Sequence, residues 1–208
     1  QTAAAFEGIS LEEFKQLEKT DEERYGTLRQ RAKAINFGNL FGQGPAGLAR
    51  TAQLQYGADM TQQEAAEALR RFAEASPQLH LWKQQQINQA NLWRQVRTRL
   101  GLLRQFDVQG QGNLKGESAN VPIQGSAAEV LLCSLTCLPK HLAGTDAVLL
   151  HNVHDELLLE VSPGQADSAA EALQAAMVDG FLQVFPEGSD LTRDLVDVKT
   201  GRSWAEVH

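Results

Sequence analysis

The hydrophobic pattern of this chain changes its period late in the sequence, and that change limits the folds open to it. Up to about His141 the apolar residues are spaced as in helices. Beyond it, Ala147–His151 and Leu157–Val161 are short apolar runs on either side of the polar segment Asn152–Glu156. Two such runs predict a β-hairpin with a polar tip. Helices followed by strands around a further helix predict an α+β fold.

Local signals predict where the elements begin and end. Ser10 with Glu13, and Thr61 with Glu64, have the spacing of capping boxes, and the first of these opens a short acidic helix. Gly101–Gly116 is rich in glycine and glutamine, so an irregular or hairpin-like connection is expected there. The remaining signals predict helices and a last strand over these ranges: 25–42, 46–56, 61–75, 76–99, 122–141, 167–184 and, for the strand, 195–199.

The net charge of −7 is unevenly distributed. Residues 1–23 carry seven acids and two bases, residues 24–140 carry fourteen bases and seven acids, and residues 141–208 carry three bases and twelve acids. A basic middle beside an acidic end suits a protein that binds phosphates on one surface and divalent cations on another. A basic helical face is also common as plain solvated surface.

Other classes of protein fit the sequence poorly. No run approaches the roughly 18 apolar residues of a membrane span, and the first residues lack the regions of a signal peptide, so no membrane partner is expected. Cys133 and Cys137 are too few for a disulfide framework or a complete zinc site. Their spacing predicts one helix face, as small core residues kept reduced in the cytoplasm.

Two cations and two aromatic residues recur at steps of four: Arg29, Lys33, Phe37 and Phe41. On a helix this spacing forms one gently drifting stripe. Cations at one end and rings at the other match a nucleotide, with phosphates first and then sugar and base. The same spacing also fits an amphipathic helix with a basic and an apolar side.

Polar residues at two further places are candidates for binding a metal or nucleic acid. His154, Asp155 and Glu156 lie at the tip of the predicted hairpin, where a turn can hold a carboxylate for a hard cation such as Mg²⁺, or can be a plain exposed turn. Asn120 and Gln124 lie four apart near the predicted start of a helix. Their amides can contact base edges or phosphates, and Asn120 could equally cap the helix.

The order of these motifs resembles that of the family A DNA polymerases, the DNA polymerase I type. Arg29–Gly42 resembles the fingers helix, or motif B, and Ala119–Ala128 is similar to the palm helix. Val153–Leu157 resembles motif C, and Gly201–Trp204 the C-terminal ending. The resemblance covers nearly the whole chain. It implies helical fingers over residues 1–100, and over residues 101–208 part of an antiparallel-sheet palm that carries the hairpin.

The resemblance implies a role for each member of the stripe. Arg29 and Lys33 would bind the triphosphate of the incoming dNTP, and Lys33 would also protonate the leaving pyrophosphate. Phe37 would pack on the nucleotide sugar. Phe41 stands where the family usually has a tyrosine, near the template base, so the ring can stack but the hydroxyl is lost.

The resemblance also implies DNA and metal contacts. Asn120, Gln124 and His154 would follow the primer-template DNA near its growing end. Asp155 would ligate catalytic Mg²⁺, of which the complete enzyme holds two ions, and Glu156 would help to order the site. The implied reaction is transfer of a nucleotide to the primer 3′-hydroxyl during DNA replication and repair.

One motif of the family has no counterpart in the sequence. Motif A, which carries the other metal-binding aspartate, would precede motif B, and no such pattern occurs here. Gly116 also stands where a basic residue is common. We therefore expect the fingers and C-terminal palm of a polymerase, as a fragment or as one piece of a split enzyme. Such a chain would be inactive alone and would need a partner chain with motif A.

Two other functions remain open from the sequence. The chain could be a non-catalytic module that binds primer-template DNA, which would survive loss of Asp155 unchanged. It could also belong to a single-subunit RNA polymerase, because such enzymes share the palm and fingers plan. Glu156 after Asp155, and the pair Phe37 and Gly38, favour a DNA polymerase.

Overall fold

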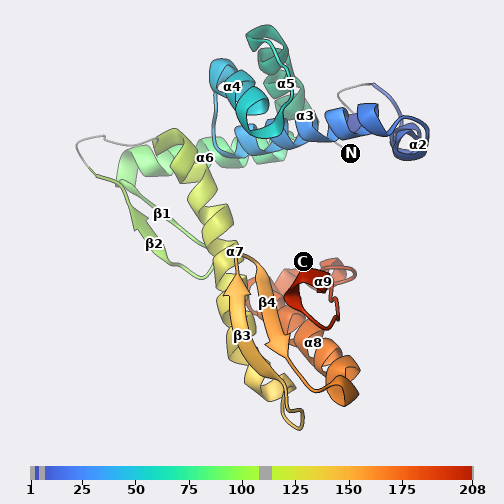
Figure 1. Cartoon of the computed structure of the whole chain (residues 1–208). Helices are drawn as coiled ribbons and strands as arrows, with labels where there is room; N and C mark the ends of the chain where they lie inside the picture. Colours follow the sequence, from blue (N-terminus) through green and yellow to red (C-terminus); the bar gives the residue numbers. More distant parts are fainter. Residues whose placement is uncertain (1–2, 5–7, 108–113, 208) are drawn as a thin grey trace. The chain divides into compact units, whose positions relative to one another are not determined.

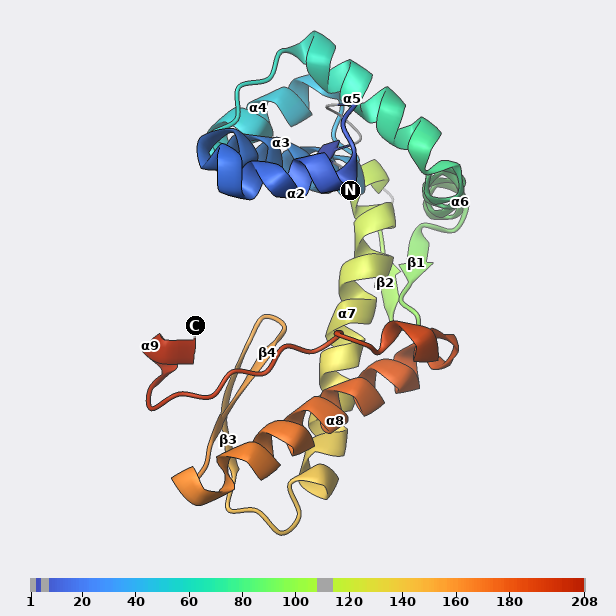
Figure 2. The ribbon, with the colours of Figure 1, turned by 90° about the vertical axis from the view of Figure 1, so that its right-hand side faces the viewer.

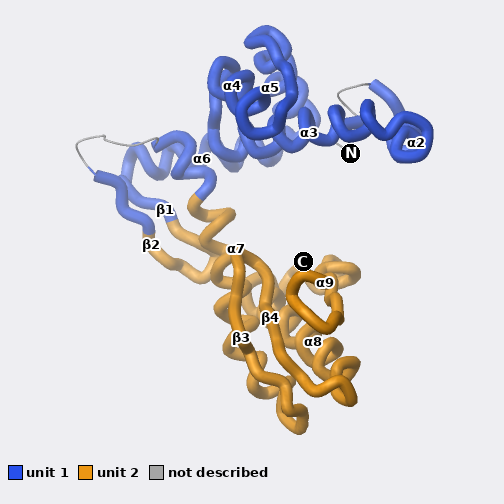
Figure 3. Tube along the Cα trace, viewed as in Figure 1, with its two compact units in different colours: residues 1–96, 104–120 blue, residues 97–103, 121–208 orange. Residues whose placement is uncertain are grey.

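The computed structural model describes residues 3–4, 8–107 and 114–207 (Figure 1). The chain divides into two compact units, coloured separately in Figure 3. Unit 1 comprises residues 1–96 and 104–120, and unit 2 comprises residues 97–103 and 121–208. The predicted boundary near residue 100 thus falls inside a short segment of unit 2, after which the chain returns to unit 1.

Unit 1 is helical, with one end of a short β-ribbon. Its elements are α2 (Leu11–Thr20), α3 (Glu22–Leu40), α4 (Pro45–Tyr56), α5 (Gln62–Ala75), α6 (Pro77–Trp93), the start of β1 (Gln95–Arg97), the end of β2 (Leu103–Gln105) and the first turns of α7 (Leu114–His141). Both predicted capping boxes are present, at the starts of α2 and α5. Gly57 ends α4 in the left-handed conformation, with φ of 60°.

The core of unit 1 lies between α3, α4 and α5. Ile35 and Leu48 are its largest fully or nearly fully buried side chains, and the other buried members are mostly alanines. Small residues allow the helices to approach closely, which fixes the rotation of α3 about its axis. A second cluster around Phe14 packs α2 against the first half of α3, where the Phe14 and Tyr25 ring centroids are 5.0 Å apart.

Unit 2 combines helices with a hairpin. It contains the rest of α7, β3 (Val148–Val153), β4 (Glu156–Glu160), η1 (Pro163–Gln165), α8 (Ala166–Val184), η2 (Pro186–Leu191) and α9 (Trp204–Val207). Figure 2 shows α8 crossing α7. At this crossing a Cβ on Gly180 would lie 2.4 Å from the Ser134 backbone nitrogen, so only glycine fits there.

A loop of unit 2 is fastened to α7 by buried polar groups. The Arg99 backbone N–H donates to Ser126 Oγ at 2.8 Å, and the Leu100 N–H donates to Glu129 Oε2 at 3.0 Å. The Thr98 hydroxyl donates to the same carboxylate. Glu129 is buried, and these donors satisfy it.

The predicted α+β fold class is confirmed, as is the hairpin. β3 and β4 pair antiparallel with Val153 opposite Glu156, so the turn has only two residues. The strands therefore run closer to the tip than the polar segment suggested. Because backbone pairing is insensitive to side-chain polarity, polar residues at an exposed hairpin end join the ladder readily.

Two helix ends differ from the prediction. α6 ends at Trp93, not near Arg99, because Arg94 is left-handed with φ of 53° and the chain then enters β1. α7 begins at Leu114, not Pro122. Pro122 lies inside the helix, which loses one backbone hydrogen bond there but continues. Part of the predicted connection over 101–116, residues 108–113, lies outside the described residues.

The strand predicted over Leu195–Lys199 is wrong. Those residues have no regular secondary structure, and no described strand pairs with them. A strand forms only beside a partner that completes its ladder, which an apolar run cannot reveal by itself.

Two expectations about α7 also need revision. It is the one helix among the described residues long and apolar enough to cross a membrane, although length and composition are weak evidence of a span. Its buried Ser126, Glu129 and Ser134 are all hydrogen-bonded inside unit 2, as in a core helix. Cys133 and Cys137 are free thiols on one face, but partly exposed and not core residues.

Candidate nucleotide and metal sites

The stripe of cations and rings lies on an exposed face of α3. Asp21 caps the helix by accepting a hydrogen bond from the Arg24 N–H at 3.1 Å. Arg29, Lys33 and Phe37 then follow at steps of four, and all three are exposed. Phe41, just beyond the helix, is exposed as well. Burial of the opposite side of α3 in the core is what turns these four side chains outward.

The aromatic end of the stripe is a stack of three rings. The Phe37 centroid lies 6.3 Å from that of Phe41 and 6.4 Å from that of Tyr56, with interplanar angles of 21° and 14°. Phe37 and Phe41 are 40% and 39% exposed. Stacked rings that remain open to solvent offer a flat apolar surface for a sugar or a base. The spacing along α3 did not predict Tyr56, because it comes from the end of α4.

The cationic end carries charge that no described carboxylate neutralises. The Arg29 guanidinium carbon lies 5.5 Å from the centroid of the Tyr25 ring. Among the described residues, Arg29 and Lys33 form no ion pair, whereas Arg31 pairs with Glu64 at 3.2 Å on another side of the helix. Two cations one turn apart are thus available to an anion.

The turn after α3 is held by close backbone approach. Gly42 has φ of 65°, and a Cβ there would lie 3.1 Å from the Cα of Gly116 in the first turn of α7. Gly38 is also constrained, because a Cβ would lie 2.7 Å from Leu48 Cδ1. Glycine at both positions lets the turn pack against α4 and α7 within unit 1.

A cation from another helix enters the same turn. Lys83 of α6 donates hydrogen bonds to the backbone and side-chain oxygens of Asn39. Lys83 is partly buried, and burial lowers the pKa of its ammonium group. No sequence pattern indicates this contact, since both residues are ordinary surface types on separate helices.

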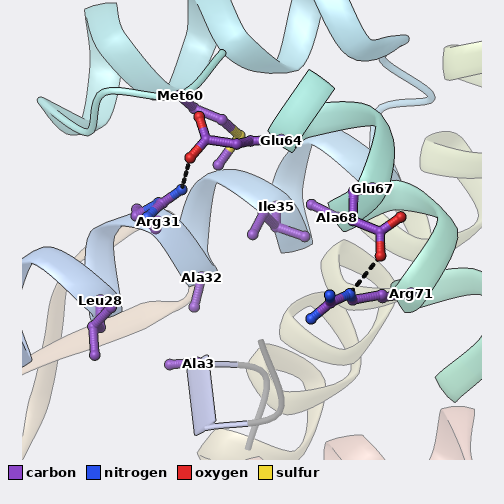
Figure 4. A pocket seen from close by; sticks show the side chains of 10 residues that line it. All are labelled: Ala3, Leu28, Arg31, Ala32, Ile35, Met60, Glu64, Glu67, Ala68 and Arg71. Carbon is purple, nitrogen blue, oxygen red and sulfur yellow. Dashed lines mark hydrogen bonds and ion pairs between the residues drawn. The ribbon is translucent and has the colours of Figure 1, made fainter. Parts of the chain in front are cut away.

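A small cavity lies on the other side of α3 from the stripe. Its volume is about 170 Å³, and Leu28, Ala32 and Ile35 of α3 line it together with residues of α5 (Figure 4). The charged groups at its rim pair with one another, Arg31 with Glu64 and Arg71 with Glu67. The cavity is therefore distinct from the stripe of cations and rings.

The acidic tip lies in unit 2. His154 and Asp155 form the two-residue turn between β3 and β4, with His154 in the left-handed region at φ of 54°. Their side chains and that of Glu156 are exposed, while Leu157 is buried and anchors β4. A left-handed residue fixes the direction of a tight hairpin turn, which holds the two neighbouring carboxylates at the tip.

The tip supplies suitable but incomplete ligands for a divalent cation. Carboxylate oxygens are the donors that Mg²⁺ prefers, so Asp155 and Glu156 fit the chemistry of such a site. Within the described part of the chain, however, no group of three or more His, Cys, Asp or Glu side chains converges as a metal site. The remaining ligands would have to come from elsewhere.

Asn120 and Gln124 lie one turn apart on α7. Asn120 is partly exposed and Gln124 is exposed. Because α7 begins at Leu114, both residues are in its interior, and the alternative that Asn120 caps this helix is wrong. Asn120 belongs to unit 1 and Gln124 to unit 2.

Comparisons with known proteins agree on one family. A model described as DNA polymerase family A matches residues 9–206. DNA polymerase I of Aquifex aeolicus is 32% identical over 163 residues, which is 77% of this chain and 28% of that protein. The mitochondrial DNA polymerase I B of Oryza sativa subsp. japonica is 30% identical over 192 residues, 88% of this chain and 18% of that protein.

A solved structure shares the fold. It is the POL domain of Pol1 from M. smegmatis, in complex with DNA primer-template and dNTP. The TM-score is 0.71 at 24% sequence identity, over 86% of this chain and 30% of that chain. The chain thus spans less than a third of the length of the relatives described here.

Proposed function

This chain belongs to DNA polymerase family A, and we propose that it provides the nucleotide-binding face and one metal-binding carboxylate of a DNA-directed DNA polymerase. The observation that carries the proposal is the exposed stripe on α3. Arg29 and Lys33 are free of described carboxylates, and the open rings of Phe37 and Phe41 follow them along the same face. The dNTP in the M. smegmatis structure supports this assignment.

Each side chain of the stripe has a part in binding or in proton transfer. Arg29 forks onto phosphate oxygens of the dNTP, and Lys33 adds a compact charge beside them. Lys33 also gives a proton to the leaving pyrophosphate, which makes it the general acid of the reaction. Phe37 packs on the sugar, and Phe41 stacks near the template base.

Three other residues contact the primer-template DNA. Asn120 and Gln124 present amides from α7, which can donate to base edges and to the sugar-phosphate backbone. His154 lies beside Asp155 in the hairpin turn, so contact of its ring with the primer end would hold that end near the carboxylate.

Asp155 is the proposed ligand of catalytic Mg²⁺, with Glu156 ordering the same tip. When bound, such ions activate the primer 3′-hydroxyl and neutralise charge on the pyrophosphate. Asp155 itself contributes an exposed carboxylate oxygen at the tip of the antiparallel hairpin. Arg29 and Lys33 stabilise the negative charge that develops on the phosphates during transfer.

A second carboxylate-bearing segment completes this site in our proposal. The described acids do not form a metal site of three or more ligands. The apolar side chains of Val148, Leu149 and Leu150 on β3 are exposed, which suits a strand packed beside this hairpin in the complete enzyme. We propose that this strand carries motif A and that the 208-residue chain alone is inactive.

Primer extension with Mg²⁺ tests the function. The chain should be inactive alone and active when mixed with a chain that supplies motif A. In that mixture, Asp155→Asn should abolish extension. Lys33→Ala should weaken dNTP binding about tenfold or more, since a charge-assisted bond is lost. Extension by the chain alone would contradict the second-segment proposal, and full activity of both variants would contradict the site.

The second candidate is a module that binds primer-template DNA without catalysis. The incomplete set of metal ligands at the hairpin tip favours it. Such a module would bind DNA without Mg²⁺ and would be unaffected by Asp155→Asn, so the same variants separate the two functions. For either function we propose a part in replication or repair and a reducing, cytoplasmic setting, the latter in keeping with the free thiols of Cys133 and Cys137.

A further inference from the structure

Lys83 makes an unusual contact for a lysine. Its side chain is partly buried, and its ammonium group donates to both oxygens of Asn39, the backbone carbonyl and the side-chain Oδ1. Among the described residues no carboxylate forms an ion pair with it. Burying part of a cation without a counter-charge is unfavourable, so other interactions must offset this cost.

The end of α3 provides such interactions. Asn39 lies in the last turn of the helix, where backbone carbonyls lack helical partners and the helix dipole is negative. A cation at this place is stabilised by both effects. Burial lowers the pKa of Lys83, as expected for a partly buried cation without a carboxylate partner.

The turn that Lys83 contacts is the one that carries the aromatic surface. Phe37 and Phe41 stand two residues before and after Asn39. The Asn39 carbonyl also accepts the Gly42 N–H at 3.0 Å, and the Phe37 carbonyl accepts the Phe41 N–H at 2.8 Å. A change in the direction of the Asn39 carbonyl would therefore alter the path from Phe37 to Gly42.

We propose that Lys83 is a positioning residue for nucleotide binding, which fixes the last turn of α3 through Asn39 and so sets the orientation of the Phe37 and Phe41 rings. Its bonds are to Asn39, and among the described residues no cation–π contact joins it to either ring, so it acts through the turn. The inference rests on the proposed function, because the rings matter only if they receive the sugar and base of a nucleotide.

The variant Lys83→Met separates this role from simple structural support. Methionine keeps an unbranched apolar stem of similar length and removes the ammonium group. Because the cost of burying the charge and the bonds to Asn39 largely offset each other, its removal should leave the thermal midpoint nearly unchanged. A residue that acts only through stability would lower the midpoint when it is replaced. Gln84→Met, at the exposed neighbouring position, is the matched control.

The experiment compares amide hydrogen exchange and dNTP affinity in the full chain. In Lys83→Met we expect the amides of Phe41 and Gly42 to exchange about fivefold to tenfold faster, as for loss of one hydrogen bond. The dissociation constant for dNTP, by calorimetry, should rise several-fold. Adding Asn39→Ala to Lys83→Met should change affinity little further, because both substitutions act on one contact.

Each other outcome has a defined meaning. Unchanged exchange at Phe41 and Gly42 would overturn the proposal, as would unchanged dNTP affinity with faster exchange. Equal effects of Gln84→Met would overturn it too. If the unaltered chain binds no dNTP at all, the proposed function fails, while the exchange data still decide whether Lys83 fixes this turn.

Discussion

Gly42 joins two constraints at one position: a left-handed backbone, with φ of 65°, and a close approach to the backbone of Gly116. A residue with a Cβ tolerates a left-handed backbone alone, or a close neighbouring backbone alone, more easily than the two together. The Phe41 ring lies directly before this position, so any shift of the turn would displace an exposed ring of the proposed nucleotide surface.

We predict that Gly42→Ala destabilises unit 1 by about 2 kcal/mol or more, since strain and a steric clash add. Gly57→Ala is the control, because Gly57 has φ of 60° but nothing within 4 Å of its added Cβ. It should cost only about 1 kcal/mol of strain. Urea unfolding followed by circular dichroism measures both. Equal losses in the two variants would show that the contact with Gly116 contributes nothing.

At the scale of elements, the Thr98–Leu100 loop depends on one buried carboxylate in α7. We predict that Glu129→Ala destabilises unit 2 by about 2–3 kcal/mol, because the Leu100 N–H and the Thr98 hydroxyl lose their acceptor. Glu171→Ala, at an exposed position of α8, should be nearly neutral. The measurement is the urea midpoint of each variant. A loss no larger than that of Glu171→Ala would contradict this account of the loop.

Helix α5 should be sensitive to acid. Hydrogen bonds from Arg70 and Arg71 lower the pKa of Glu67 from 4.5 to about 2. A carboxyl group with a depressed folded-state pKa stabilises the fold above its unfolded pKa, and that contribution disappears as the pH falls through the folded value. We therefore expect the unfolding free energy to decline between pH 4.5 and about pH 2.

The variant Glu67→Gln isolates the contribution of this one carboxyl group. Its urea midpoint should depend less on pH across the same window than that of the unaltered chain. Because Glu67 is exposed, added salt should also reduce the difference. An identical pH dependence in both chains would contradict the assignment.

Elements with local signals could be predicted, and those set by distant partners could not. The capping boxes of α2 and α5 and the β3–β4 hairpin follow from a few neighbouring residues. The end of α6 and the absence of a strand at 195–199 depend on pairing with other segments. Residues 114–121, the first turns of α7, could not be predicted because a proline marks a helix start more often than a helix interior.

The candidate site likewise has a part that local spacing predicts and a part that depends on distant partners. Steps of four within α3 predict the stripe from Arg29 to Phe41, because all its members belong to one helix and its end. Tyr56 and Lys83 reach it from α4 and α6, and only tertiary packing brings them there. The resemblance to family A polymerases is confirmed, while the role of each residue stays a prediction.

At the scale of the whole molecule, the distribution of charge predicts how the proposed DNA binding depends on salt. Within the described residues of unit 1 from Arg24 onward, and apart from Lys83, six cations form no ion pair with a described carboxylate and remain available to phosphates: Arg24, Arg29, Lys33, Arg50, Arg94 and Lys115. Counterion release by roughly this number of contacts gives a slope of log K against log salt of about −5 at most.

We predict that Arg50→Gln reduces the magnitude of this slope by about one, because it removes one exposed cation that is available to a phosphate. Arg70→Gln is the control. Arg70 already pairs with Glu67 and Glu74 at 2.6 and 2.5 Å, so its loss should leave the slope unchanged. Fluorescence anisotropy with labelled primer-template over a salt series gives both slopes. Equal changes would mean that the ion pairs do not decide which cations reach DNA.

The interleaving of the two units has a consequence for anyone who wishes to dissect the protein genetically. A stop codon or a cleavage site after residue 96 would not release an intact half. The N-terminal product would lack residues 104–120, among them Lys115 and Gly116, whose backbone atoms lie close to Gly42. A C-terminal product starting at residue 121 would leave Glu129 buried without Thr98 and Leu100. Separate expression of either unit therefore calls for a circularly permuted or loop-spliced gene and not for a truncation.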